Sequence, residues 1–318
     1  MPGTPPTRFV YLGPEGTFTE QALRTIPAAD HGVRTPARSV PEALDAVRTG
    51  AADAALVPLE NSVGGAVPVT LDELAVGEPL VITREVVLPV EFVLGAPGPV
   101  PLTQIRTVAA HPQASAQCRN WLLTHLPDAV IVDVLSNATA AVEAADGRYD
   151  AAICAPIGIS RNGLTVLADK IADHAEAVTR FALVSRPATP TPPTGDDVTS
   201  LAVYIAHDRV GALLAVLTEF AVRGVNLSRI ESRPTGEQLG LYVFFLDCTG
   251  HVAEPRLGEA LQGLRRICAE VRFLGSYPRH RWSTAAGDRP VPSPAGLSDA
   301  DFADSAAWLT KVRAGELS

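Results

Sequence analysis

The chain has 318 residues, enough for two or three compact domains, with a formal net charge of −9. This acidic balance, without a basic block, argues against nucleic-acid or anionic-membrane partners, and no apolar run approaches the ~20 residues of a membrane span. The four cysteines, Cys118, Cys154, Cys248 and Cys268, have no CxxC spacing. We therefore expect neither a disulfide framework nor a metal site. Residues 1–7 lack the apolar core of a signal peptide, so we expect a cytoplasmic protein.

Residues 8–186 alternate between strand and helix signals. For example, Ser39 followed by Glu42 resembles a capping box and predicts a helix that ends at Gly50. Apolar runs predict strands at 9–12, 54–59, 86–94, 108–110, 130–134, 151–153 and 181–184. The alternation predicts an α/β domain with parallel strands. We expect two lobes, one of residues 8–85 with 168–186 and one of 86–167, facing each other across a cleft.

The rest of the chain predicts a second domain and a tail. Residues 187–197 contain four prolines and predict a linker. Over 198–277 the signals read βαββαβ, the ferredoxin-like plan of an α+β domain. Its expected strands are 200–206, 227–232, 239–246 and 271–274. Its first expected helix runs from an Asp208 cap to Gly224, with the apolar positions Val210, Leu213, Leu214, Leu217 and Ala221. Its second expected helix covers 255–269. The tail, 278–318, is expected to be irregular over 282–294 and then helical, with Ser298 as cap and Phe302, Leu309 and Val312 on one face.

Two polar clusters stand at the ends of predicted strands. Thr179 and Arg180 place a hydroxyl and a permanent cation where a strand begins, which suits a small anionic substrate. The segment Glu60 to Ser62 follows a strand and is followed by glycines that let backbone approach a polar ligand. The structural alternatives are a salt-bridged strand start and a plain Gly-rich turn.

Further polar groups point to the same kind of site. The loop from Gly13 to Thr17 can offer N–H groups to an anion, although it lacks any nucleotide-binding motif. Gln113 and Gln117 share one helix face next to His111, which is as consistent with a structural hydrogen bond as with catalysis. No covalent-nucleophile or metal signature stands out, so an enzyme site here would use hydroxyls, amides and arginine. In the second domain, small residues at a helix start fit either carboxylate binding or ordinary packing.

Together these segments resemble the prephenate dehydratase family. The resemblance is carried by Tyr-Leu-Gly-Pro-Glu-Gly-Thr-Phe at 11–18, Pro-Leu-Glu-Asn-Ser at 58–62, His-Pro-Gln at 111–113 with Gln117, and Thr-Arg-Phe at 179–181. The second domain resembles an ACT regulatory domain through Gly-Ala-Leu at 211–213 and Glu-Ser-Arg-Pro at 231–234. The similarity covers about residues 8–278, and the terminal helix is similar to that of actinobacterial members.

The resemblance implies a two-lobed catalytic domain like a type 2 periplasmic binding protein, without a cofactor. It implies a lyase that converts prephenate to phenylpyruvate in phenylalanine biosynthesis. Its implied catalytic residues are Thr179, Arg180, Asn61 and Gln117, and its implied substrate contacts are Glu60, Ser62, Thr17 and Phe181. It also implies L-phenylalanine as an effector of a homodimer or homotetramer, bound between ACT domains near Gly211, Ala212, Leu213, Asn226, Glu231, Ser232, Arg233 and Pro234.

Four positions depart from the family pattern. They are Gly64, where an acidic residue is usual, Ala110, Ala155 and Ala177. These departures keep open related lyases of the same fold, an arogenate dehydratase or a non-aromatising prephenate decarboxylase. A non-catalytic amino-acid sensor is the alternative from another class.

Overall fold

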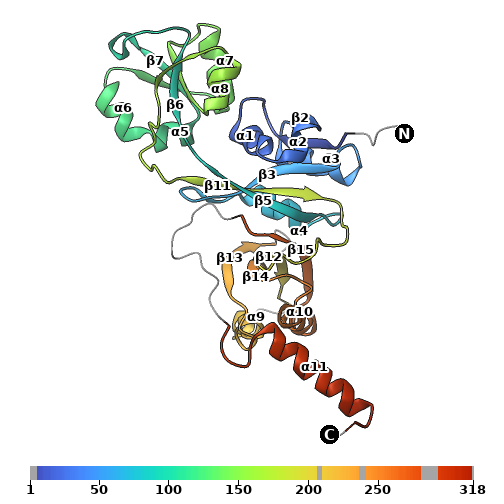
Figure 1. Ribbon diagram of the computed structural model, residues 1–318. Helices are drawn as coiled ribbons and strands as arrows, with labels where there is room; N and C mark the ends of the chain where they lie inside the picture. The colour runs from blue at the N-terminus through green and yellow to red at the C-terminus, as the bar shows by residue number, and fades with distance from the viewer. Residues whose placement is uncertain (1–5, 206–209, 236–240, 281–292, 317–318) are drawn as a thin grey trace. The chain divides into compact units, whose positions relative to one another are not determined.

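The computed structural model describes residues 6–205, 210–235, 241–280 and 293–316. The chain forms two compact units (Figure 1). Unit 1 contains 1–73 and 86–186, and unit 2 contains 74–85 and 187–318. Nothing in the sequence predicts that 74–85 groups with the C-terminal unit. This stretch contains the end of one regular helix and the start of one regular strand. None of the helices among the described residues is long and apolar enough to cross a bilayer.

The first lobe is built on a sheet of strand order β2-β1-β3-β11-β5, with the short β4 paired to β3. Its strands are β1 Arg8–Leu12, β2 Val33–Ala37, β3 Ala54–Asn61, β4 Gly65–Ala66, β5 Val81–Pro89 and β11 Val178–Ser185, and its helices are α1 Phe18–Arg24, α2 Pro27–Asp30, α3 Val40–Arg48 and α4 Pro68–Ala75. Strands β1, β2 and β3 are parallel, but β11 runs antiparallel to β3. The prediction of parallel strands was therefore wrong at β11, because the chain returns from the second lobe in the opposite direction.

The second lobe has the strand order β10-β6-β9-β7-β8. Its elements are β6 Val93–Ala96, the 3-10 helix Leu102–Gln104, β7 Thr107–Ala110, α5 Pro112–Gln117, α6 Arg119–His125, β8 Val130–Asp133, α7 Asn137–Ala145, β9 Ala151–Cys154, α8 Pro156–Arg161 and β10 Thr165–Ala168. Strands β7, β8 and β9 are parallel, whereas β6 pairs antiparallel with β9 and β10.

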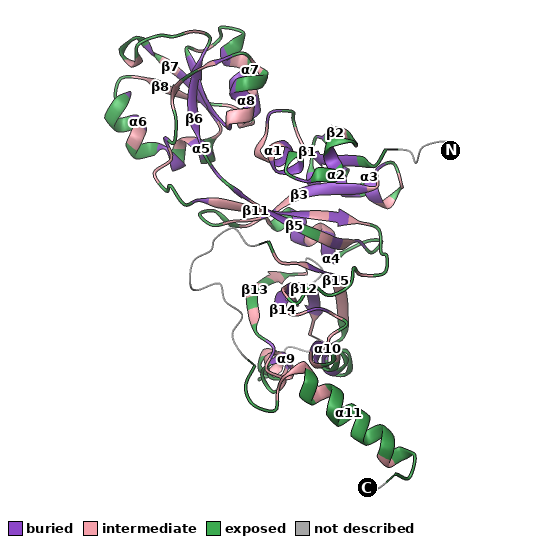
Figure 2. Ribbon diagram, viewed as in Figure 1, coloured by how far each residue is buried: buried purple, intermediate pink, exposed green. Residues whose placement is uncertain are grey.

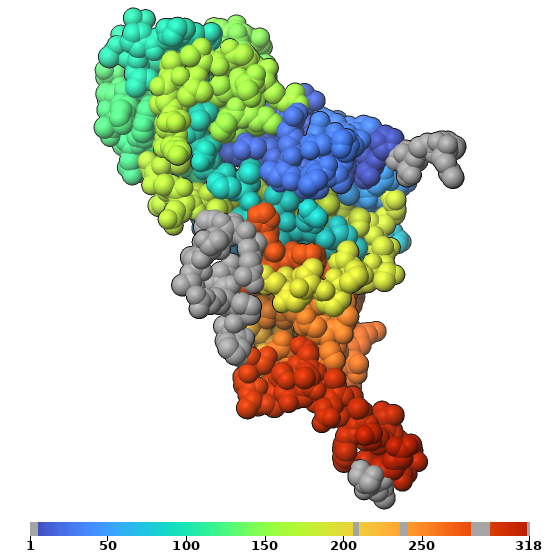
Figure 3. All heavy atoms as spheres, viewed as in Figure 1, coloured from blue at the N-terminus to red at the C-terminus, as the bar shows by residue number. Residues whose placement is uncertain are grey.

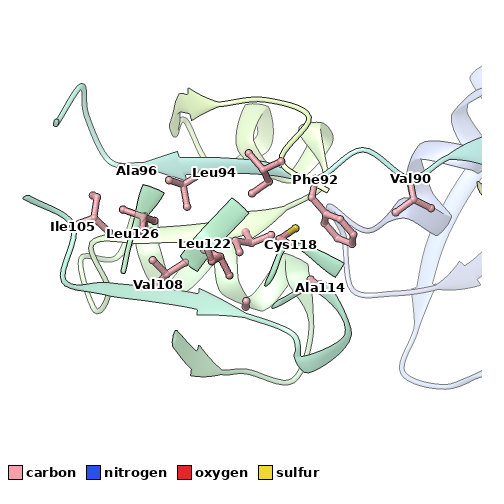
Figure 4. Packing of buried hydrophobic residues seen from close by; sticks show 14 of the residues in the cluster. Val90, Phe92, Leu94, Ala96, Ile105, Val108, Ala114, Cys118, Leu122 and Leu126 are labelled. Atoms are coloured by element: carbon pink, nitrogen blue, oxygen red, sulfur yellow. The ribbon is translucent and has the colours of Figure 1, made fainter. Parts of the chain in front are cut away.

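The chain passes between the lobes at two places that lie side by side. The strand expected over 86–94 is two strands, β5 and β6, separated by Val90 to Phe92. In this crossing the N–H of Val90 donates to Ala177, and the carbonyl of Phe92 accepts from Ile171. Phe92 lies at the edge of the core of the second lobe, with Val90 next to it on the way to the first lobe (Figure 4). The two crossing segments therefore form a paired connection.

Unit 2 contains a sheet of order β13-β14-β12-β15, which confirms the ferredoxin-like plan. Its elements are β12 Asp197–Tyr204, α9 Ala212–Ala221, β13 Leu227–Pro234, β14 Tyr242–Thr249, α10 Pro255–Ile267, β15 Glu270–Pro278 and α11 Asp299–Arg313. Helices α9 and α10 pack on one face of this sheet around Val216, Phe220 and Leu264. The apolar stripe predicted for α9 was partly wrong, because Leu214 and Ala221 are exposed. Val210 is exposed too and lies before the helix, whose N-cap is Gly211.

Some predictions fall outside the described residues, namely those on 1–5, 206–209, 236–240 and 281–292. They include the Asp208 cap and the irregular part of the tail. The terminal helix α11 begins at the predicted Ser298 cap, which forms a capping box with Asp301. No residue of α11 is buried, and its helix is coloured as exposed over most of its length in Figure 2.

Segment 74–85 is held inside unit 2 by strands β12 and β15 of its sheet. Arg272 on β15 donates to the carbonyl oxygens of Ala75 (2.8 Å) and Val76 (3.3 Å) and to that of Gly77, and Tyr204 on β12 donates to Ala75 at 2.8 Å. These carbonyls lie at and beyond the C-terminal end of α4, where the helix dipole favours a cation. The end of α4 is thus capped by an arginine from the other end of the chain.

Candidate active site

Thr179 and Asn61 are neighbours across strands β11 and β3. They are directly paired in the antiparallel register, and the Nδ2 of Asn61 donates to the Oγ1 of Thr179 at 2.9 Å. Paired residues on adjacent strands project to the same face of a sheet, which explains why two side chains 118 positions apart meet. Both are half-buried, so the pair stays accessible to a small molecule.

The carboxamide of Asn61 is held by the loop that follows it. Its Oδ1 accepts from the backbone N–H of Val63 at 2.9 Å and of Gly64 at 2.8 Å. An Asx turn of this kind is a local preference of asparagine and needs no distant partner. The orientation of the carboxamide, with nitrogen toward Thr179, follows from these two donors.

Arg180 and Glu60 are the next pair along the same two strands. Their charged groups are 3.8 Å apart, and the Arg180 side chain is 16% exposed. The register then shifts, since Phe181 pairs with Pro58 and Leu59 becomes the extra residue on β3. Bulges of this type often occur beside functional sites, where they redirect side chains. The shift thus lies directly beside the Thr179–Asn61 and Arg180–Glu60 pairs.

Three predicted substrate contacts already have structural partners. The Oγ of Ser62 accepts from the N–H of Val178 at 3.0 Å, which ties the loop to β11. The Oγ1 of Thr17 donates to Leu12 and, as N-cap of α1, accepts from Glu20. Phe181 is 2% exposed and belongs to the core of the first lobe. For these three residues a direct substrate contact stays a prediction.

The second lobe contributes amide side chains. An added Cβ at Gly64 would lie 2.9 Å from the Nε2 of Gln113, so α5 comes close to the Asn61 loop. His111 is the N-cap of α5, and its Nδ1 accepts from the N–H of Gln113 at 3.2 Å. Gln117 is 7% exposed, and among the described residues its buried Oε1 has no hydrogen-bond partner. A buried acceptor without a donor is uncommon and fits an O–H supplied by a ligand.

A pocket of about 400 Å³ lies on one side of this loop. Ser62, Val63 and residues 173–177 line it, but Thr179 and Asn61 do not. The acidic residues Asp173 and Glu176 are among its lining residues. The Thr179–Asn61 pair is therefore not part of this acidic pocket.

A buried ion-pair cluster connects the two lobes beside the Gly13–Thr17 loop. Glu20 is 1% exposed and accepts from Arg161 of α8 at 2.6 Å, from Arg24 at 2.9 Å and from the N–H of Gly16 at 2.7 Å. Burial alone would raise the pKa of Glu20, but the hydrogen bonds from Arg161 and Gly16 outweigh it and lower the pKa. In Figure 3, blue atoms of the first lobe lie against yellow-green atoms of the second.

The cysteines offer no nucleophile. All four are free and buried, and burial raises the pKa of Cys118 and of Cys154 to about 12. Among the described residues, no group of three or more His, Cys, Asp or Glu side chains could hold a metal ion. The Thr179–Asn61 and Arg180–Glu60 pairs therefore present a hydroxyl, a carboxamide, a guanidinium and a carboxylate.

The predicted effector residues lie in unit 2 at two elements. Gly211 is the N-cap of α9 with a φ of 82°, a left-handed conformation that glycine adopts without strain. Ala212 and Leu213 are half-buried in the first turn of α9, and Asn226 is exposed before β13. Glu231, Ser232, Arg233 and Pro234 occupy the C-terminal half of β13, an edge strand that pairs with β14.

The chain therefore combines a two-lobed α/β unit with a ferredoxin-like α+β unit. A family model for prephenate dehydratase matches residues 9–189, and one for the ACT domain matches 199–266. The chain belongs to the prephenate dehydratase family.

The relatives cover almost the whole chain. A prephenate dehydratase of Amycolatopsis methanolica is 50% identical and covers 98% of this chain and 99% of its own length. A solved structure of prephenate dehydratase from Arthrobacter aurescens in complex with L-Phe has 47% identity and a TM-score of 0.89, covering 96% of this chain and 99% of that one. GqqA, a quorum-quenching acylase, has 30% identity and a TM-score of 0.77, covering 86% and 98%.

Proposed function

We propose that this chain converts prephenate to phenylpyruvate, with loss of carbon dioxide and water, as a carbon–oxygen lyase of phenylalanine biosynthesis. The observation that best supports this function is the Asn61–Thr179 hydrogen bond, with Arg180 as the next residue, in a chain that belongs to this family. The buried, free cysteines fit a reducing cytoplasm.

The reaction needs positioning and one proton. The bond between the ring and its carboxylate breaks, and the electron pair enters the ring as carbon dioxide leaves. The bond to the ring hydroxyl breaks on the opposite side of the ring, and with one proton the oxygen leaves as water. Because aromatisation supplies the driving force, the protein has to hold a dianion and stabilise charge on the departing oxygen.

Each residue of the proposed site has its own role in this reaction. Thr179 donates a hydrogen bond to the departing oxygen, Arg180 pairs with a substrate carboxylate, and the unsatisfied Oε1 of Gln117 accepts an O–H from substrate or from the water formed. Glu60 balances the charge of Arg180 in the free enzyme.

The test is phenylpyruvate formation by Thr179→Val, which has nearly the same shape without the hydroxyl. We expect kcat to fall on the order of 10²–10³-fold, as for loss of one donor to a developing charge, with a smaller change in KM. Near-normal turnover would overturn the role of Thr179. In the parent enzyme, prephenate consumed without phenylpyruvate would identify a non-aromatising lyase, and activity on arogenate alone would identify an arogenate dehydratase.

An acylase activity like that of GqqA has less support here. Acyl transfer by a side chain needs a nucleophile activated by an adjacent base. The hydroxyl of Thr179 is bonded to a carboxamide nitrogen, which cannot take a proton, and the thiols are buried with raised pKa values. Incubation with an acyl-homoserine lactone should therefore leave that substrate unchanged.

We further propose that L-phenylalanine binds at the start of α9 and lowers activity through a homodimer or homotetramer. Val210 and Leu214, on either side of Gly211 to Leu213, are 106% and 67% exposed, and Ile230 on the edge strand β13 is 48% exposed. Apolar side chains left exposed at the start of α9 and on an edge strand suit a second ACT domain. Light scattering with and without phenylalanine tests the assembly, and a monomer under both conditions would overturn it.

A further inference from the structure

We propose that Asn61 is a positioning residue that fixes the direction in which the Thr179 hydroxyl donates its proton. This inference rests on the proposed role of Thr179 and adds a cause for it. The hydroxyl carries one hydrogen and can point it toward Asn61 or away from it. The surroundings of Asn61 decide between these two arrangements.

The carboxamide of Asn61 has only one favourable orientation. Its Oδ1 accepts two backbone N–H groups, from Val63 at 2.9 Å and Gly64 at 2.8 Å. Exchanging oxygen and nitrogen would set an NH₂ group against both N–H donors, so that neither hydrogen bond could form. The Nδ2 of Asn61 therefore faces Thr179 and donates to it.

Since Nδ2 can only donate, the Oγ1 of Thr179 must accept from it. The hydrogen of the hydroxyl is then directed elsewhere, and among the described residues no acceptor is paired with it. The departing oxygen of the substrate is the acceptor that the proposed reaction provides. Accepting from Asn61 also polarises the hydroxyl and strengthens its own donation.

The deciding variant is Asn61→Asp, which keeps the shape but replaces the donor by an acceptor. One carboxylate oxygen can still accept from Val63 and Gly64, so the loop keeps its conformation. The other oxygen would now draw the hydrogen of Thr179 toward itself and away from substrate. We expect Asn61→Asp to lose on the order of 10²–10³-fold in kcat, at least as much as Asn61→Ala.

A purely structural role of Asn61 predicts the opposite order. Asn61→Ala removes both loop hydrogen bonds, whereas Asn61→Asp retains them, so Asn61→Asp would then be the more active variant. That order would overturn the inference while leaving the role of Thr179 intact. Circular dichroism and the unfolding midpoint show that each variant is folded.

A double-mutant cycle separates proton direction from charge repulsion. In the Thr179→Val background there is no hydroxyl to redirect, so adding Asn61→Asp should leave kcat within about twofold. Repulsion of the dianionic substrate would instead persist in that background and raise KM in both. A full additional loss of kcat in the double variant overturns the inference, and a fully active Thr179→Val overturns the role of Thr179 on which the inference rests, while absence of phenylpyruvate with the parent enzyme overturns the proposed function.

Discussion

Arg161 donates to Glu20 at 2.6 Å and so joins helix α8 of the second lobe to helix α1 of the first. Two glycines allow the two lobes to come this close. An added Cβ at Gly158 would lie 3.3 Å from the carbonyl oxygen of Gly16, and Gly16 itself has a φ of +87°. Glu20 is buried and Arg161 is 32% exposed. The pair therefore holds the two lobes at a defined separation at this point.

Removing this connection should weaken both stability and substrate binding. We expect Arg161→Ala to lower the free energy of unfolding by about 2 kcal/mol, the usual range for a hydrogen bond to a charged group. KM should rise because the separation of the lobes is less fixed. Denaturant unfolding and steady-state kinetics measure the two effects. Arg148→Ala is the control, since its pair with Glu143 is exposed, and an equal loss there would contradict the prediction.

The same carboxyl group predicts a dependence on pH. The pKa of folded Glu20 lies below its ordinary value of 4.5. A lowered folded pKa stabilises the protein fully above the unfolded value, and this contribution is lost as pH falls through the folded value. Glu20→Gln should therefore be less stable than the parent at neutral pH, with a difference that shrinks below about pH 4.5. A difference that stays constant into acid would contradict this.

The thiols should be inert in the native protein. Burial raises the pKa of Cys118 and Cys154 to about 12, so almost no thiolate is present near neutral pH. We expect iodoacetamide at pH 8 to leave activity unchanged and to label the protein only after unfolding. Mass spectrometry counts the labelled residues. Rapid labelling with loss of activity would place a cysteine at the site.

Replacing Gly64 by alanine should change stability little but should weaken substrate binding. An added Cβ meets the far end of the Gln113 side chain, which can move, so we expect a stability change below about 1 kcal/mol for Gly64→Ala. Moving Gln113 away from the loop should raise KM several-fold. Gly98→Ala is the control, because nothing lies within 4 Å of its added Cβ. Identical kinetics for both variants would contradict a role for Gln113.

Unit 2 depends on a buried ion pair. Asp247 is 1% exposed and accepts from Arg229 at 2.9 Å and from Ser200 at 2.6 Å. Asp247→Ala leaves the arginine buried without its partner and should cost ~3–5 kcal/mol in the stability of unit 2. The exposed Asp304→Ala should change it by less than about 0.5 kcal/mol. Thermal unfolding compares them, and equal midpoints would refute the prediction.

The sequence predicted the elements better than their pairing. The ends of β3 and β11 carried recognisable polar residues, but no spacing indicates that Thr179 lies opposite Asn61, because antiparallel register depends on the whole sheet. The strand Val33–Ala37 was missed because it is an edge strand with exposed polar residues and Pro36. The orphaned Oε1 of Gln117 likewise becomes visible only once burial is known.

The capping of α4 by Arg272 limits how the regulatory part can be removed. A chain cut after Arg186 would keep residues 74–85 but lose every partner that unit 2 offers them, including the donors to Ala75 and the N–H of His280 that Glu85 accepts. Glu85, now 6% exposed, would meet solvent, as would the end of α4. Truncation after Arg186 is thus expected to disturb the structure of the remaining domain. The activity of the truncated enzyme would therefore not report the loss of regulation alone.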